Sequence, residues 1–140
     1  MFRKLLVAYD GSEGAIKALI AGLELAKSFD VDLHAVAVEE ELPRYAATMD
    51  EIEAVKEQKD AYYGQLNRCA EAMAHAEGVT LHTTIIPGHE VSALVDYILE
   101  YGFDTLLVGF HGHSAISERL RGSTTGSLVL HAPCTVIVVK

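Results

Sequence analysis

Two glycine-containing segments near the end of the chain have the residue types and spacing of a phosphate-binding site. The first contains Gly109 and Gly112, and nine residues later the second begins at Gly122 and opens a helical pattern. Glycine lets a backbone turn tightly and approach a ligand without a Cβ in the way. A helix start offers unpaired N–H groups and roughly half a positive charge. We therefore predict an anion site that includes Gly109, Gly112, Gly122, Ser123, Thr124 and Thr125.

The alternative is that these glycines only serve turns and that Ser123 or Thr125 is an ordinary N-cap, a position where both residue types are preferred. The charge distribution favours the anion site. The chain has 20 acidic and 11 basic residues and a net charge of -9, yet residues 109–140 carry three basic residues and one acidic residue. The overall acidity argues against a nucleic-acid partner, because affinity for phosphate backbones comes from clustered Lys and Arg.

Apolar patterns predict the strands that position these segments. Four nearly continuous apolar runs are typical of strands covered on both faces, and a fifth, Val79 to Ile86, alternates like a half-exposed edge strand. The four buried runs are Phe2 to Tyr9, Val31 to Val38, Thr105 to Gly109 and Thr135 to Val139. Ligands of open parallel sheets bind beyond the carboxyl ends of the strands, so we expect those ends to converge.

Helical patterns lie between these strands. Apolar residues repeat at spacings of three and four over Gly14 to Phe29, Asp50 to Glu77, Val91 to Leu99 and Thr125 to His131. The inner side of the long second helix is expected to carry Ile52, Val55, Leu66, Cys69 and Met73. Because strand and helix alternate, we predict an α/β fold, with an open parallel sheet, right-handed crossovers and helices on both faces.

Length and composition exclude several classes of protein. A chain of 140 residues buries one core, so we expect a single domain over residues 1–140. No apolar run approaches the roughly 20 residues that span a bilayer, and the first run is too short for a signal peptide, so we expect a cytoplasmic protein with no membrane partner. The P-loop and dinucleotide fingerprints are absent, which excludes P-loop kinases and dehydrogenases.

Seven histidines raise the question of a metal site. Zinc needs three or four converging ligands, and no Cys or carboxylate stands at a telling distance from His111 and His113. We therefore predict no metal site formed by protein ligands. His111 is expected to donate to a phosphate or to pack within its loop.

Taken together, the terminal segments and the glycine motif resemble the ATP-binding branch of the universal stress protein family. The similar segments are Gly109-x-x-Gly112, then Gly122-Ser123 after nine residues, the ending Ala132 to Val139 and the start Leu6 to Ser12. The resemblance covers essentially the whole chain. It implies a Rossmann-like single domain with a five-stranded parallel sheet of order 3-2-1-4-5, a homodimer, and bound ATP, ADP or AMP with Mg²⁺ held through the phosphates.

The resemblance also implies roles for single residues. Asp10 would bind ribose hydroxyls or assist a metal, and the backbone of Val38 would pair with the adenine edge. Gly109 and Gly112 would flank the ribose and the α-phosphate. Ala8 and Tyr9 would lie beside the adenine, and Gly122, Ser123, Thr124 and Thr125 would hold the β- and γ-phosphates. Judged from its neighbours alone, Asp10 makes a local Asx-type turn or caps the next helix, roles that do not exclude ligand binding.

One turn departs from the family pattern. Members often have G-x-P after the third strand, but here Pro87 precedes Gly88, and Glu90 stands where that proline would be. The resemblance therefore does not define this wall of the site.

Few cations are available to catalyse phosphoryl transfer. No lysine occurs between Lys59 and Lys140, and the nine-residue segment offers only Arg119 and Arg121, which fold over the phosphates or solvate a turn. An arginine finger alone contributes a factor of about 10³ to 10⁵. We therefore predict a stress-response regulatory protein that binds ATP, hydrolyses it slowly or not at all, and has no catalytic residues.

Two other functions remain as alternatives: a slow ATPase or self-phosphorylating enzyme, and a nucleotide-free, chaperone-like dimer. The missing catalytic cation disfavours the first, and the intact glycines disfavour the second. The final run, Thr135 to Val139, is apolar on both faces and would expose an unpaired edge. We expect it to pair with its copy in a homodimer, and we expect nucleotide occupancy to control contacts with an unknown protein partner.

Overall fold

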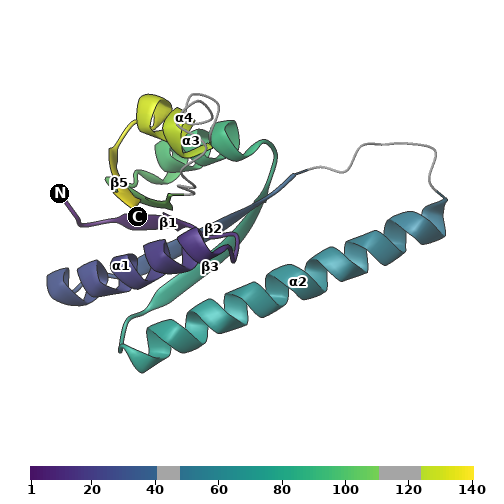
Figure 1. Ribbon diagram of the computed structural model, residues 1–140, viewed down its shortest axis with the longest axis horizontal. Helices are drawn as coiled ribbons and strands as arrows, with labels where there is room; N and C mark the ends of the chain where they lie inside the picture. Colours follow the sequence, from purple (N-terminus) through teal and green to yellow (C-terminus); the bar gives the residue numbers. More distant parts are fainter. Residues whose placement is uncertain (41–47, 111–123) are drawn as a thin grey trace.

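Five parallel strands form one sheet in the order β3-β2-β1-β4-β5 (Figure 1). The computed structural model describes residues 1–40, 48–110 and 124–140. The strands are β1 (Leu5–Ala8), β2 (Leu33–Glu39), β3 (Leu81–Pro87), β4 (Thr105–Gly109) and β5 (Thr135–Val139). The predicted fold class and strand order are therefore confirmed.

Helices cover both faces of the sheet, as Figure 1 shows. They are α1 (Glu13–Phe29), α2 (Met49–Ala76), α3 (Glu90–Tyr101) and α4 (Thr124–His131). The helix boundaries follow local chemistry. The Ser12 side chain caps α1, Thr48 and Glu51 form a capping box at the start of α2, and Gly102 ends α3 in the left-handed conformation.

The core lies in two layers because successive residues of a strand point to opposite faces. In the central strand β1, Leu5 and Val7 pack under α1 and α2, whereas Leu6 packs under α3 and α4. All three side chains are fully buried. This sandwich places the helix starts near the carboxyl ends of the strands, where the predicted site lies.

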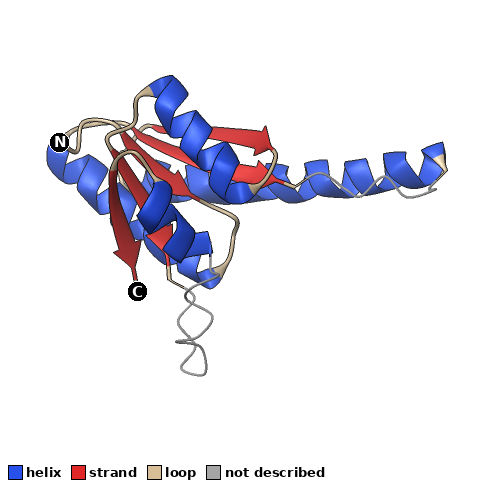
Figure 2. Cartoon of the chain, turned by 90° about the horizontal axis from the view of Figure 1, so that it is seen from above, coloured by secondary structure: helices blue, strands red, loops and turns tan. Residues whose placement is uncertain are grey.

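The predicted inner side of α2 is correct for only part of the helix. Leu66 and Met73 pack against the core, but Ile52 is 48% exposed and Cys69 is also exposed. A helix of 28 residues is about 42 Å long, whereas a seven-residue strand such as β3 spans about 23 Å. The N-terminal half of α2 therefore extends beyond the sheet (Figure 2).

Two strands begin later than predicted. Phe2 has a φ of 58°, outside strand geometry, so β1 begins at Leu5. The Val79 N–H donates to the Ala74 carbonyl and closes the end of α2, so β3 begins at Leu81. As predicted, β3 lies at the edge of the sheet. Within the described residues, no helix has the length and apolar content needed to cross a membrane.

Candidate functional site

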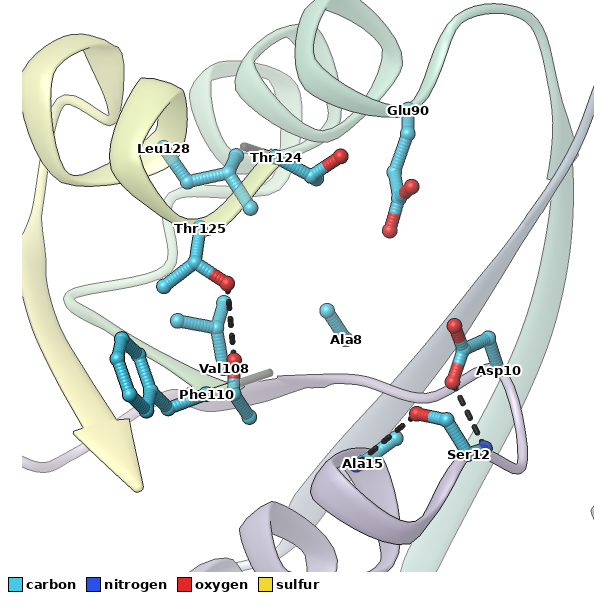
Figure 3. Close-up of a pocket in the computed structure, with 11 residues that line it drawn as sticks. Ala8, Asp10, Ser12, Ala15, Glu90, Val108, Phe110, Thr124, Thr125 and Leu128 are labelled. Carbon is cyan, nitrogen blue, oxygen red and sulfur yellow. Dashed lines mark hydrogen bonds between the residues drawn. The ribbon is translucent and has the colours of Figure 1, made fainter. Parts of the chain in front are cut away.

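The carboxyl ends of β1 and β4 border a hollow on which the starts of α1, α3 and α4 also converge (Figure 3). Its walls combine small and apolar residues with two carboxylates and several hydroxyls. The lining residues are Ala8, Asp10, Ser12, Ala15, Glu90, Val108, Gly109, Phe110, Thr124, Thr125 and Leu128. The structure thus brings together Ala8, Asp10, Gly109, Thr124 and Thr125, five of the residues proposed from the sequence.

Asp10 begins the tight turn that leads from β1 into α1. Its Oδ1 accepts from the Ser12 N–H at 2.9 Å, and the Ser12 Oγ accepts from the Ala15 N–H at 3.2 Å. Gly11 sits between them with a φ of 81°, which glycine adopts without strain. The local Asx-type turn expected for Asp10 is therefore present. Its second carboxylate oxygen lies on the Glu90 side of the turn (Figure 3).

Gly109 is needed where β4 passes the start of α1. A Cβ at this position would lie 2.3 Å from the Gly14 carbonyl carbon and 2.4 Å from its oxygen. The sequence interpretation assigned this glycine to a close approach by ligand, but the backbone it approaches is that of α1. Gly109 is therefore a packing residue as well as part of the lining of the hollow.

Thr125 connects α4 to the same strand end. Its hydroxyl donates to the Gly109 carbonyl at 2.9 Å (Figure 3). The hydroxyl proton is thus directed at the protein, so any hydrogen bond to a phosphate would come from the N–H groups of the first helical turn. Thr125 therefore positions the helix start, a role that the sequence pattern did not distinguish from direct contact.

A second hollow adjoins the first and shares Ala8, Asp10 and Glu90 with it. It extends to β2 and is also lined by Tyr9, Val36, Val38, Glu40, Lys59, Tyr63 and Leu94. The side chain of Tyr9 is only 4% exposed and lies in the core beneath α1, and burial raises its pKa. Tyr9 and Val38 thus border this hollow rather than the first one.

Two tyrosines of α2 fasten the strand ends that form these walls, and the sequence analysis missed both. The Tyr62 hydroxyl donates to the Asp10 carbonyl at 2.8 Å, and the Tyr63 hydroxyl donates to the Val38 carbonyl at 3.4 Å. Burial and the Glu39 carboxylate raise the pKa of Tyr63. The available signal was an adjacent pair of tyrosines in an otherwise polar helix.

The described side chains give the site a negative character. Asp10 and Glu90 are the charged residues in the described lining of the first hollow. The second adds Glu40 and Lys59, and the Lys59 ammonium donates to the Glu40 carbonyl at 3.1 Å and lies 4.0 Å from a Glu39 oxygen. Positive potential at this edge comes from the helix starts. In the part of the chain that the structure describes, no three His, Cys, Asp or Glu residues are grouped to hold a metal ion.

Several proposed residues lie outside the described residues. They are His111, Gly112, Gly122 and Ser123, together with Arg119 and Arg121 of the intervening segment.

Comparisons with known proteins agree over the whole chain. The model of the Universal stress protein family matches residues 1–140. Universal stress protein YxiE of Bacillus subtilis is 29% identical over 153 residues, and the alignment covers all of both proteins. A solved universal stress protein in complex with cAMP is 25% identical, with a TM-score of 0.73 over 99% of this chain and 96% of the other. A universal stress protein from Lactobacillus plantarum has a TM-score of 0.78 at 24% identity, covering 99% and 98%.

Proposed function

The chain belongs to the universal stress protein family, and from this premise we propose that it binds an adenine nucleotide across the carboxyl ends of β1, β2 and β4. The observation that carries the proposal is the pair of adjoining hollows, one largely apolar and the other beside a helix start. A nucleotide has the same division into a flat apolar base and an anionic end. A relative of known structure binds cAMP, which supports an adenine nucleotide as the ligand class.

The base would occupy the hollow bordered by Val36, Val38 and Leu94. The ribose would lie near Asp10, which both hollows share, and the phosphates would lie beside Gly109 and the first turn of α4. Helix starts favour anions because their N–H groups lack intrahelical partners and the dipole is positive there. A Mg²⁺ ion held through the phosphates would meet carboxylate oxygens from Asp10 and Glu90, the donor type that this ion prefers.

We propose a regulatory role for ATP binding in the stress response, with slow or negligible hydrolysis. The described lining of the first hollow contains no lysine, arginine or histidine that could stabilise charge on a transferring phosphoryl group. Such a cation contributes a factor of about 10³ to 10⁵ in enzymes that transfer phosphate quickly. Nucleotide occupancy would then act through protein contacts rather than through turnover.

A homodimer through β5 is part of this proposal. In the described sheet β5 pairs with β4 alone, and Val136 and Val138 pack toward one layer while Ile137 and Val139 pack toward the other. An apolar edge strand of this kind favours association with another strand. Sedimentation at micromolar protein should give twice the mass of one chain.

Calorimetric titration of the purified protein with cAMP, AMP, ADP and ATP, with Mg²⁺ present, tests nucleotide binding. We expect heat on binding and a melting transition that rises with ligand, since a ligand at 100 times its Kd stabilises by about 2.7 kcal/mol. Ala8→Leu should fill the wall shared by both hollows and weaken binding more than tenfold, whereas Ala8→Ser should not. No heat and no change in melting with millimolar nucleotide would overturn the proposal.

A further inference from the structure

Glu90 lies where the hollows of the carboxyl edge meet. It lines the two hollows described above and a third, shallower one between α3 and α4. Figure 3 shows its carboxylate reaching from the start of α3 into the space between Asp10 and Thr124. A ligand that spans the first two hollows must therefore pass this side chain.

The backbone at Glu90 is held in place from both sides. Glu90 is the first residue of α3, and the Ala93 N–H donates to the His89 carbonyl at 2.8 Å. On the other side, the Gly88 N–H donates to the Glu39 carbonyl at the end of β2 at 3.1 Å. The turn is thus tied to a neighbouring strand, so the carboxylate is presented to the site from a fixed base.

Charge is the property that Glu90 adds to the site. With Asp10 it makes two carboxylates in the described lining of the first hollow, on a chain of net charge -9. An acidic group at a helix start is favoured in its ionised form. Like charges a few ångströms apart repel, and each further negative charge on a ligand raises that repulsion. The base and ribose, which are uncharged, are not affected in this way.

We infer that Glu90 selects among nucleotides by charge: it favours a ligand with one phosphate group over a free di- or triphosphate, which binds well only with a divalent cation. The cation lowers the charge of the polyphosphate and turns the carboxylate oxygens from repelling groups into suitable partners. The inference rests on the proposed nucleotide site and names the ligand form that this site accepts.

Glu90→Gln tests the inference because it removes the charge and keeps the shape. Calorimetry should give the Kd of AMP and of ATP, each in EDTA and in excess Mg²⁺. In EDTA we expect the ratio of the ATP Kd to the AMP Kd to fall about tenfold in the variant, as expected for removal of one nearby like charge. In Mg²⁺ the fall should be smaller than threefold, because the cation already offsets the charge of the ligand.

Glu13→Gln is the matched control. Glu13 is also in the first turn of a helix, but its side chain is 92% exposed and lines neither hollow, so we expect its ratio to stay within twofold of the natural protein's. A second readout needs no variant: in the natural protein, raising the ionic strength from about 0.05 to 0.5 M should lower the ratio, because salt screens the repulsion.

The outcomes separate the two proposals. AMP binding with an unchanged ratio in Glu90→Gln, an equal fall in Glu13→Gln, or a ratio insensitive to salt overturns the selector and leaves the nucleotide site standing. Absence of binding by the natural protein and by both variants, in either buffer, overturns the site and the selector together.

Discussion

The two ends of the sheet are built in opposite ways. At the carboxyl end, β1 and β4 finish beside a hollow that carries two carboxylates and a helix start. At the amino end, rings fill the corresponding space: His34 packs edge-on to Phe103 with centroids 5.0 Å apart, and Tyr97 stacks on Phe103 at 5.6 Å. The Lys4 ammonium lies 4.8 Å from the centre of the same Phe103 ring.

Hydrogen bonds add to this closure of the amino end. One oxygen of Asp104 accepts from the Arg3 and Lys4 N–H groups at 2.9 and 3.2 Å, and the other accepts from the Thr105 hydroxyl at 2.8 Å. The chain entering β1 is thus tied to the chain entering β4. The difference indicates that one end of the sheet stabilises the fold while the other remains open to a ligand, as expected for parallel sheets.

Gly109 is the residue at which this separation fails, and Gly109→Ala should have the largest effect. The added Cβ would meet the Gly14 backbone at 2.3 Å, and backbone atoms cannot move aside as a side-chain tip can. We expect the free energy of unfolding to fall by about 3 kcal/mol, the upper part of the range for overpacking. Nucleotide affinity should fall as well, because α1 and β4 both border the hollow. Urea denaturation and calorimetry measure the two effects.

Gly64→Ala is the control for this substitution. Gly64 lies within α2, and its Cβ would meet only a terminal nitrogen of Arg68, at 3.3 Å. Alanine is favoured over glycine in a helix by about 1 kcal/mol, so this variant should be as stable as the natural protein or more stable. Equal stability of Gly109→Ala and the natural protein would show that β4 and α1 do not need their close approach.

Asp104→Ala should have an intermediate effect and should act at the amino end alone. The substitution leaves the Arg3 and Lys4 N–H groups without their carboxylate partner, which costs about 1 to 2 kcal/mol for partly exposed charged hydrogen bonds. Asp60→Ala, on the exposed side of α2, should change stability by less than about 0.5 kcal/mol. Reduced nucleotide affinity in folded Asp104→Ala would contradict the separation of the two ends.

The effect of Asp104 should depend on pH. Partial burial acts to raise its pKa, but the hydrogen bonds from Thr105, Arg3 and Lys4 outweigh it, and the pKa lies below its ordinary value. The folded state therefore favours the carboxylate. Its stabilising contribution is complete above the unfolded pKa of about 3.9 and is lost as the pH falls through the lower folded value. The stability difference between the natural protein and Asp104→Ala should therefore be smaller at pH 3 than at pH 7.

Much of the fold could be predicted from the sequence because both cores leave a periodic record. The apolar runs of β2 and β4 and the stripe of α3 each mark a buried face. The same record failed for the N-terminal half of α2, where Ile52 continues the apolar stripe of Leu66 but is exposed. Periodicity shows that a helix has an apolar side, but not whether another element reaches far enough to cover it.

The site could be predicted only where it follows strand ends. Asp10 and Gly109 are found by their place after β1 and at the end of β4, and the structure brings both to one hollow. The contacts of Tyr63 with β2 depend on how α2 crosses the sheet, which no local pattern encodes. Gly109 shows a further limit, because a glycine that admits a ligand and a glycine that admits a helix look the same in a sequence.

His34 should give the smallest effect of the amino end, and one that depends on pH. Burial lowers its pKa, as do the positive charges of His82 and Lys4, while Asp32 opposes them. The neutral ring is therefore favoured in the folded state, where it stacks on His82 with centroids 4.7 Å apart. Its contribution is complete above the unfolded pKa of about 6.5 and is lost as the pH falls below that value.

His34→Gln removes this titration and so makes it measurable. Between pH 7.5 and 5.5 the natural protein should lose less than about 1 kcal/mol more stability than the variant, a small loss because solvent screens a partly exposed group. Ring-proton NMR should place the His34 midpoint below about 6.5. Nucleotide affinity should respond to pH equally in both proteins, because His34 lies at the far end of β2 from the hollows. A variant that loses as much stability as the natural protein would show that the ring pair of the amino end does not sense pH.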